Sequence, residues 1–298
     1  MKPNTRAYIY GGFTVLFWGT SASAFKIGLQ QLSFIQLLFL ANLTSVFILL
    51  GFLIYQGKLL TVWPTNRKDW GYSALLGLLN PFGYYLILLK AYTLLPAQVA
   101  QPLNFVWPVV LVFLAVPILG RKLSGWSILS LLISFVGVAV ISSQGKLTGL
   151  ANTSLLGVFL ALFSSLLWAL FWVFNVKDRR AEEEKLFLNF LFSLIYLIAI
   201  SPFIPDFYII NTGGIWAGVY VGFFEMGVAF LFWLKALSCT TSTDKLGNII
   251  YLVPFLSLVF IHFVVGETIF WTTFAGLCLI VFSVVFQQVM DKRINRRV

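Results

Sequence analysis

The chain has 298 residues, of which 60% are hydrophobic and only 10% are charged. A typical soluble domain carries about 25% charged residues. The sequence also contains 31 Phe and 10 Trp residues, more large aromatic side chains than a protein of this size can keep away from water. This composition excludes a soluble domain and predicts an integral membrane protein.

Charged residues divide the sequence into ten apolar windows. Each window is close to or longer than the roughly 20 residues that a helix needs to cross a bilayer. The windows lack the alternating pattern of barrel strands, so the predicted fold is all-α. The loops between them are short and leave no room for a soluble domain. The ten helices are predicted at residues 7–29, 34–55, 70–90, 97–118, 123–143, 154–176, 186–205, 214–237, 246–265 and 270–290.

Basic residues indicate the orientation of these helices. Ten helices place both termini on one side of the membrane. If that side is the cytoplasm, it receives all 20 Lys and Arg residues except Lys26, Lys90 and Lys146. The positive-inside rule therefore predicts a multi-pass protein of the cell inner membrane with cytoplasmic termini. The lipid bilayer is an expected partner and nucleic acid is not, and the run DRRAEEEK at 178–185 is predicted to be a solvated cytoplasmic loop.

Short sequence landmarks recur in the same order in the two halves of the chain. Pro108 and Pro254, for example, are 146 residues apart. This order predicts a duplication, with a first repeat over residues 1–148 and a second over residues 149–298. Because each repeat holds five helices, an odd number, the two repeats enter the membrane in opposite directions. Inverted repeats of this kind typically place a substrate site near the bilayer midplane, between the repeats.

A single acidic residue, Glu225, interrupts the apolar run YVGFFEMGVAF at residues 220–230. A carboxylate there is costly unless it is paired, hydrated or neutralised. Its counterpart in the first repeat is Asn80, and the following Pro81 predicts a helix kink. Acids inside membrane helices usually mark substrate or proton pathways, so Glu225 is predicted to bind substrate and to couple transport. The alternative is a carboxyl group that a neighbouring helix satisfies purely for packing.

Six residues serve as landmarks of a known pattern: Trp18 and Gly19 early in the first helix, Pro108 and Pro254, which are predicted to kink the two fourth helices, and Gly266 and Glu267 in a turn. With ten helices in two repeats, this pattern resembles the EamA branch of the drug/metabolite transporter superfamily, over nearly the whole chain. The segment NFVWP at 104–108 is similar to the aromatic amino acid exporters of that superfamily. The sequence departs from the family pattern at Arg121, where the turn usually carries an acid, and at Glu225. The resemblance implies a central cavity lined by helices 1–4 and 6–9, with helices 5 and 10 at the periphery.

Further polar and aromatic residues lie in the helices that this resemblance places around the cavity. As a set, the amides suit the polar head of an amphipathic solute, although interhelical hydrogen bonding explains any one of them equally well. Trp107 and Tyr251 lie beside the prolines of the fourth helices, where their rings can stack on an aromatic solute or hold a cation. Other tryptophans fit interfacial belts. The candidates are Asn42, Asn80, Gln98, Gln101, Asn104, Asn189 and Asn248 among the amides, and Trp18, Tyr84, Trp107, Trp168 and Tyr251 among the aromatic residues.

Enzyme signatures are missing from the sequence. It has one His, no intramembrane pair of acids, no H-E-x-x-H motif and no Walker loop, which excludes ATP-driven transport by this chain alone and leaves a secondary transporter. The resemblance implies amino acids or related amphipathic amines as substrates, moved outward. The inverted repeats predict alternating access, Glu225 makes a proton the candidate coupling ion, and no cofactor is expected. The alternatives are a metabolite or cofactor importer or exchanger on the same fold, a passive channel and, more distantly, a polytopic membrane enzyme. A monomer and a homodimer both stay open.

Overall fold

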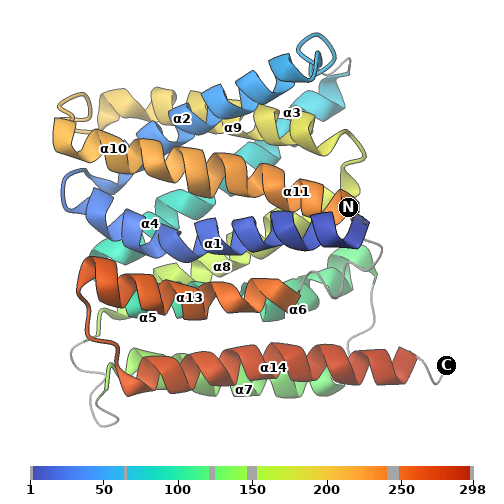
Figure 1. Ribbon diagram of the computed structural model, residues 1–298, viewed down its shortest axis with the longest axis vertical. Helices are drawn as coiled ribbons and strands as arrows, with labels where there is room; N and C mark the ends of the chain where they lie inside the picture. The colour runs from blue at the N-terminus through green and yellow to red at the C-terminus, as the bar shows by residue number, and fades with distance from the viewer. Residues whose placement is uncertain (1–2, 64–65, 121–124, 146–152, 240–247, 296–298) are drawn as a thin grey trace. The chain divides into compact units, whose positions relative to one another are not determined.

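The computed structural model describes residues 3–63, 66–120, 125–145, 153–239 and 248–295, and every regular element within these ranges is helical. The segments η1, η4 and η6 are π-helical, and η3 and η5 are 3₁₀ helices. In chain order the elements are α1 (Pro3–Leu29), α2 (Phe34–Tyr55), α3 (Arg67–Gly77), η1 (Leu78–Gly83), α4 (Tyr84–Leu94), α5 (Ala97–Asn104), α6 (Trp107–Leu119), α7 (Gly125–Ser142), α8 (Leu155–Lys177), α9 (Glu182–Ile200), η3 (Ser201–Phe203), α10 (Thr212–Tyr220), η4 (Val221–Val228), α11 (Ala229–Cys239), η5 (Asn248–Leu252), α13 (Val253–Phe260), η6 (Ile261–Val265) and α14 (Trp271–Asn295) (Figure 1).

Each predicted range is helical over most of the residues that the structure describes. Within the described chain, nine helical segments are long and apolar enough to cross a membrane, judged by length and composition. The segment α1 is 27 residues long but is not one of the nine, because its polar first turn, its hydroxyl side chains and Lys26 make it less apolar. The predicted orientation also depends on residues that lie outside the described ranges, namely Lys2, Arg121, Lys122, Lys146, Lys245, Arg296 and Arg297.

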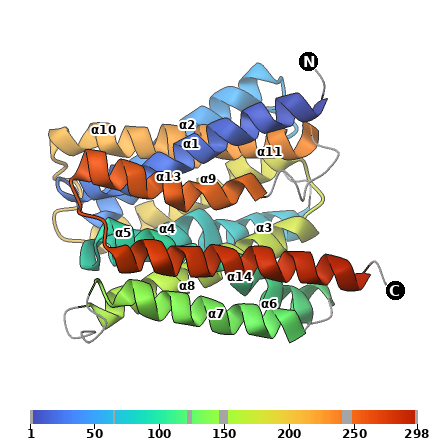
Figure 2. The ribbon, with the colours of Figure 1, turned by 60° about the horizontal axis from the view of Figure 1, so that its bottom comes forward.

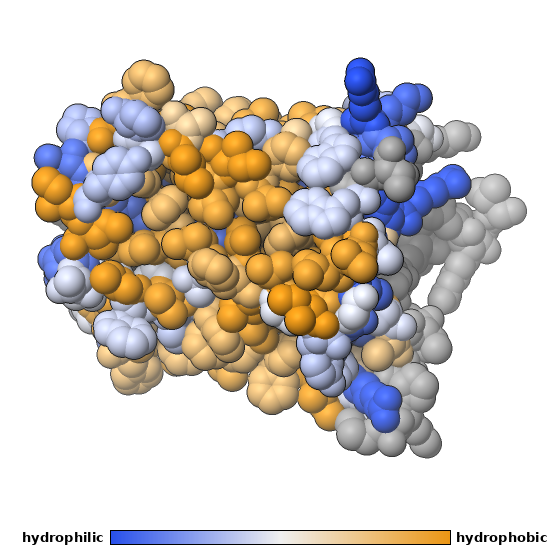
Figure 3. Space-filling model, turned by 90° about the horizontal axis from the view of Figure 1, so that it is seen from above, coloured by the Kyte–Doolittle hydropathy of each residue, from blue (hydrophilic) through white to orange (hydrophobic). Residues whose placement is uncertain are grey.

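The outward-facing surfaces of these helices are apolar. Phe47 of α2 and Leu132 and Phe135 of α7 are each more than half exposed. Figure 3 shows hydrophobic side chains across the middle of one face, with hydrophilic side chains gathered toward both ends. Water rarely faces so continuous an apolar surface, whereas lipid tails solvate it. The chain is therefore a multi-pass membrane protein.

The chain forms two units, and each contains helices from both halves of the sequence. The first unit comprises Met1–Leu89 and Arg179–Gly266. In it α1 packs against α11 and α13, as Figure 1 shows, while α2 packs against η4 and α9. The helix α9 in turn packs against α3 and η1. This unit holds the segment that carries Glu225.

Small residues allow α2 and η4 to approach closely. Gly214, Gly218 and Gly222 recur every four residues along α10 and η4, which places them on one helix face. At Gly222 an added Cβ would lie only 2.3 Å from the carbonyl oxygen of Ala41. The hydroxyl of Ser45 also donates a hydrogen bond to the Gly222 carbonyl at 2.8 Å. These contacts fix the position of η4 beside α2.

The second unit comprises Lys90–Asp178 and Glu267–Val298. Its helices α7 and α14 run side by side in both ribbon views (Figures 1 and 2). They touch at two glycines: a Cβ added at Gly137 would lie 2.8 Å from the Gly276 carbonyl oxygen, and one at Gly276 would lie 2.6 Å from that of Gly137. The α7–α14 pair is thus in backbone contact.

Glu267 anchors the start of α14 to the start of α5. Its two carboxylate oxygens accept hydrogen bonds from the backbone N–H groups of Ala97, at 2.8 Å, and Gln98, at 3.1 Å. These are the unpaired donors of the first turn of α5, where a negative charge is also favoured. The Gln98 side chain completes the anchor, since its amide bonds the Thr268 carbonyl at 2.8 Å and the Phe270 N–H at 2.7 Å. Gln98, a predicted solute ligand, is therefore occupied in holding this turn.

Candidate functional site

Glu225 lies inside the π-helical segment η4 and its side chain is buried. The hydroxyl of Tyr85, on α4, donates a hydrogen bond to Oε1 at 3.1 Å. Ser21 of α1 lies beside the same carboxyl group. The other oxygen, Oε2, has no hydrogen-bond partner among the described residues. One carboxyl oxygen is thus hydrogen-bonded, and the other is buried without a hydrogen-bond partner among the described residues.

The π-helical turn also changes the backbone around Glu225. The N–H of Ala229 bonds to the carbonyl of Phe224, five residues earlier, and not to the carbonyl of Glu225 as in an α-helix. The Trp18 indole N–H, from α1, donates to the Glu225 carbonyl at 3.3 Å. Single π-helical turns occur frequently at functional sites. The structure therefore brings Trp18, a predicted site residue, directly to Glu225.

Aromatic rings pack against Trp18 and Tyr85, the two aromatic residues that bond Glu225. The Trp18 ring packs against Phe230 and Trp233, with centroid distances of 5.8 and 6.0 Å. Tyr84, a predicted site residue, is buried and packs edge-on against Tyr85 at 4.7 Å. The site can offer an ionisable oxygen to a polar group and ring faces to an apolar or cationic one.

Three predicted asparagines are buried in the same unit. The backbone at Asn80 is non-helical, with φ −152° and ψ 125°, and Pro81 follows it, so the predicted break in this helix is confirmed. Asn42 of α2 donates from Nδ2 to the carbonyl of Phe190 at 3.1 Å, next to Asn189 of α9. Neither amide atom of Asn80 or of Asn189 has a hydrogen-bond partner in the described part of the chain.

The fourth helix of each predicted repeat is broken just before its proline. Pro108 lies in the first turn of α6, after Trp107, and Pro254 lies in the first turn of α13. Both fourth helices are thus interrupted beside the proline predicted to kink them, and each proline begins the helix that follows, where its missing N–H is not needed. Tyr251 is buried in the 3₁₀ segment η5, whereas Asn248, at the start of η5, is exposed.

The remaining candidates lie in the second unit. Trp107 and Trp168 meet edge to face with their centroids 6.4 Å apart, and Asn104 donates from Nδ2 to the Ser164 hydroxyl at 2.9 Å. Gln101 accepts a hydrogen bond from the Tyr92 hydroxyl at 2.6 Å. The predicted site residues thus divide into two sets: Trp18, Asn42, Asn80, Tyr84, Asn189, Glu225, Asn248 and Tyr251 in the first unit, and Gln98, Gln101, Asn104, Trp107 and Trp168 in the second.

The sequence prediction selected Tyr84 and missed Tyr85, the residue that bonds Glu225. No signal in the sequence distinguishes the two, because the break at Asn80 resets the phase of the helix that follows. Ser21 was missed for a simpler reason, since serines are common at helix contacts in membranes.

The predicted solvated loop at 178–185 is helical in its second half. The helix α9 begins at Glu182, and Lys185 is buried with its ammonium 2.7 Å from the Glu182 carboxylate. The loop prediction is therefore wrong for these residues, because acids in the first turn favour a helix start and the aliphatic stem of a lysine can be buried.

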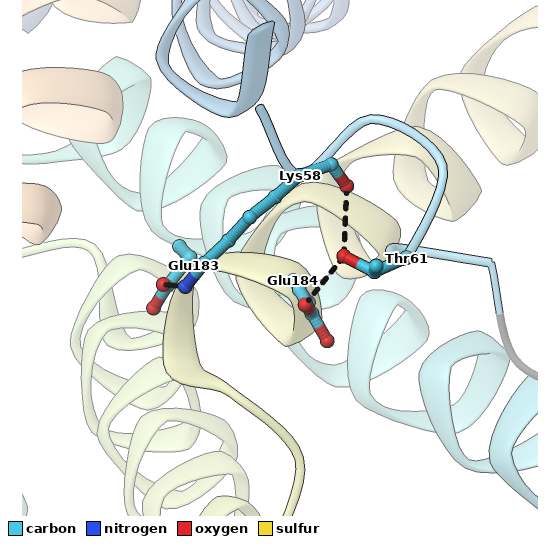
Figure 4. Close-up of polar contacts among 4 residues, drawn as sticks. All are labelled: Lys58, Thr61, Glu183 and Glu184. Carbon is cyan, nitrogen blue, oxygen red and sulfur yellow. Dashed lines mark hydrogen bonds and ion pairs between the residues drawn. The ribbon is translucent and has the colours of Figure 1, made fainter. Parts of the chain in front are cut away.

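Figure 4 shows how the loop after α2 is held to the first turn of α9. Lys58 forms an ion pair with Glu183, and the Thr61 hydroxyl donates to Glu184 at 3.3 Å. The hydrogen bond to Glu183 raises the pKa of Lys58 above its usual value. At the same end of the unit, the ammonium of Lys235 lies 5.2 Å from the Phe52 ring centroid. This end of the unit is therefore charged and ordered.

The sequence matches the EamA-like transporter family over residues 5–143 and again over residues 155–287. The chain belongs to the EamA-like transporter family. This match confirms the resemblance at the level of the family and points to a membrane transporter rather than an enzyme. A transporter of this family has a small-molecule substrate and the lipid bilayer as partners.

Several relatives of this EamA-like chain carry the same general description. An uncharacterized transporter of Clostridium kluyveri is 26% identical, over 97% of this chain and 95% of that protein. The uncharacterized transporter YvbV of Bacillus subtilis is 27% identical, over 95% of this chain and 91% of its own length. A solved crystal structure aligns with a TM-score of 0.70 at 20% identity, covering 96% of this chain and 97% of the other. The last similarity shows that the fold is shared.

Proposed function

We propose that this EamA-like transporter exports amino acids or related amphipathic amines across the inner membrane as a secondary transporter, and that Glu225 handles the charge. The observation that carries the proposal is the state of its carboxyl group, which is buried, bonded at Oε1 by Tyr85 and without a hydrogen-bond partner among the described residues at Oε2. In such surroundings an ionised carboxylate needs a counter-charge. A proton or a substrate ammonium group supplies it.

Competition between a proton and the substrate ammonium group for Oε2 of Glu225 couples the movement of one to the movement of the other. When a proton occupies the carboxyl group, the site is neutral and has little affinity for an ammonium group. When an amine binds, the proton leaves and the carboxylate pairs with the amine, while the faces of Trp18 and the neighbouring rings hold the apolar part of the substrate. Proton movement in one direction thereby drives amine movement in the other.

The proposed architecture has ten spanning helices, with α1 as the tenth, in two inverted repeats that alternate access to the site. The two successive family matches support the duplication. The α7–α14 pair supports the inversion. At the 146-residue separation, Gly137 corresponds to Ser283 and Ser130 to Gly276. Gly137 packs on Gly276, the counterpart of Ser130, and the Ser130 hydroxyl donates at 2.9 Å to the carbonyl of Ser283, the counterpart of Gly137. This reciprocal pairing is the one expected at a two-fold axis.

The ion pair of Lys58 with Glu183 supports the proposed orientation. It brings the loop after α2 and the start of α9 to the same end of the first unit (Figure 4). Both segments belong to the side that the positive-inside rule assigns to the cytoplasm.

Counterflow in proteoliposomes tests the proposal. Wild type is loaded with unlabelled substrate and assayed against a panel of labelled amino acids and amines, beside Glu225→Gln and a control, Glu184→Gln, which makes the same chemical change at the charged end of the unit. We expect counterflow of at least one panel member, retained in the control, and either lost or made independent of pH in Glu225→Gln. Counterflow that Glu225→Gln leaves unchanged contradicts the role of Glu225. The absence of counterflow for every panel member contradicts the substrate class.

A further inference from the structure

Several fully buried polar side chains of the first unit lack hydrogen-bond partners within the described ranges. Both amide atoms of Asn80 and of Asn189 and the hydroxyls of Ser73 and Ser193 are in this state. Native proteins leave few buried polar groups unpaired, because the loss of hydration is not recovered. A small polar species that fits among these side chains accounts for them.

These side chains belong to one helix contact. Asn189 and Ser193 are one turn apart on α9, and Ser73 and Gly77 are one turn apart on α3, so each pair shares a helix face. The two faces meet, because α9 packs against α3 and η1 and a Cβ added at Gly77 would lie 2.4 Å from the Asn189 carbonyl oxygen. Asn80 follows Gly77 by three residues, at the break in η1. We call Ser73, Asn80, Asn189 and Ser193 the polar track.

One end of the polar track is next to an ion pair close to solvent, and the other end leads to Glu225. Lys185 lies one turn before Asn189 on α9 and is buried, and its partner Glu182 has a side chain that is 46% exposed. At the other end, Asn80 precedes by five residues Tyr85, whose hydroxyl bonds Glu225. The track therefore lies between a carboxylate in contact with solvent and the carboxyl group at the centre of the candidate site.

The chemistry of the track selects water as its occupant. Each unpaired amide offers both a donor and an acceptor, and each hydroxyl can act as either. A metal cation would leave the amide nitrogens unmatched, and a carboxylate would leave the amide oxygens unmatched, whereas water serves both. Side chains one turn apart are neighbours on a helix face, and a buried water typically makes about three hydrogen bonds to polar groups that otherwise lack partners.

We propose that the polar track holds a chain of ordered water molecules that carries protons between the Glu182 end of α9 and Glu225; the proposal rests on the proposed role of Glu225 as a proton carrier. One proton enters the chain at the solvent end, each water passes one proton onward, and the Glu225 carboxylate becomes a neutral carboxyl group. Tyr85 is the titratable group bonded to Glu225. Two other elements that pack on η4 present neutral groups to it, Trp18 and Ser21 from α1 and Ser45 from α2.

Infrared spectroscopy of the purified protein in liposomes tests this path without any substrate. The carbonyl stretch of the protonated Glu225 carboxyl group is assigned by its loss in Glu225→Gln. After transfer from H₂O to D₂O, the rate at which this band shifts reports how fast protons reach Glu225. We expect Asn189→Leu to slow the shift at least about tenfold, equivalent to about 1.4 kcal/mol of barrier, and Ser193→Ala to slow it less. Ser134→Ala on α7, a control that removes a hydroxyl bonded to Ser283, should exchange like wild type.

Thermal unfolding gives a second measurement on the same variants. If water satisfies the Asn189 amide, Asn189→Leu removes a paired group and leaves the unfolding temperature unchanged or lower. If the amide is dry, the substitution removes an unpaired group and raises that temperature. A raised unfolding temperature, a wild-type exchange rate in folded Asn189→Leu, or no protonated carboxyl band between about pH 5 and 9 overturns the proposal. A failure of counterflow alone contradicts the proposed substrate and leaves these measurements standing.

Discussion

Replacing Gly222 by Ala tests whether the close contact between α2 and η4 fixes the segment that carries Glu225. The new Cβ would lie 2.3 Å from the Ala41 carbonyl oxygen and 2.6 Å from the Thr44 Cβ, both closer than the 3.0 Å that real Cβ contacts keep. The backbone oxygen cannot rotate away, so the two helices must separate by about the missing 0.7 Å. The hydrogen bond from Ser45 to the Gly222 carbonyl, now 2.8 Å, then lengthens.

The expected cost follows from these contacts. Overpacking costs about 1–3 kcal/mol, and a lost interhelical hydrogen bond in a membrane adds about 0.6 kcal/mol. The higher helix propensity of Ala stabilises the helix by about 1 kcal/mol and offsets part of this cost. The net destabilisation is about 0.6–2.6 kcal/mol. At about 2–4 °C per kcal/mol this is a fall of roughly 1–10 °C in unfolding temperature, measurable by thermal unfolding in detergent.

Gly51→Ala is the matched control for Gly222→Ala, because the same substitution on α2 meets nothing within 4 Å. It should leave the unfolding temperature unchanged or raise it. If Gly222→Ala unfolds at or above the temperature of wild type, or moves in step with Gly51→Ala, the contact between α2 and η4 does not fix η4 and the reasoning is refuted.

Three further predictions concern contacts elsewhere in the two units. Glu267→Ala should lower the unfolding temperature, because helix caps contribute about 0.5–2 kcal/mol. Glu267→Gln keeps one acceptor and should lower it less. Equal stability of both variants and wild type would show that the cap is dispensable. A double-mutant cycle of Lys58→Met and Glu183→Gln should give a coupling below about 1 kcal/mol that salt weakens, since both side chains are partly exposed. Because the folded-state pKa of Lys58 lies above the ordinary 10.5, this coupling is present below that pH and is lost as the pH rises through the folded-state value; a coupling that persists in strong alkali contradicts the assignment. Trp18→Phe removes the indole N–H that bonds the Glu225 carbonyl and also shrinks the ring that packs on Phe230 and Trp233. It should weaken substrate affinity in counterflow while the protein stays folded, and unchanged affinity would limit Trp18 to a packing role.

The positions of the helices could be predicted from the sequence because a bilayer leaves the backbone no other way to pair its polar groups. The predicted range 34–55 coincides with α2, and Ser33 and Gln36 form a capping box at its start. The break at Asn80 was also predictable, since Pro81 lacks the N–H that a continuous helix needs.

The irregular turns and the partners of the site could not be predicted in the same way. The segment around Glu225 contains no proline, and its side chains suit an α-helix as well as a π-helical turn. The choice between Tyr84 and Tyr85 depends on the helix phase after the break at Asn80, which the sequence does not define. The burial of Lys185 depends on packing around the first turn of α9, which a run of charges does not reveal.

The glycine contact between α7 and α14 links two positions that are distant in the sequence. Gly137 and Gly276 each occupy the space that a side chain on the other would need. A larger residue at either position uses up the room available to both, so the two sites cannot change size independently during evolution. However far the two halves of the chain diverge elsewhere, this helix crossing constrains residues 137 and 276 jointly.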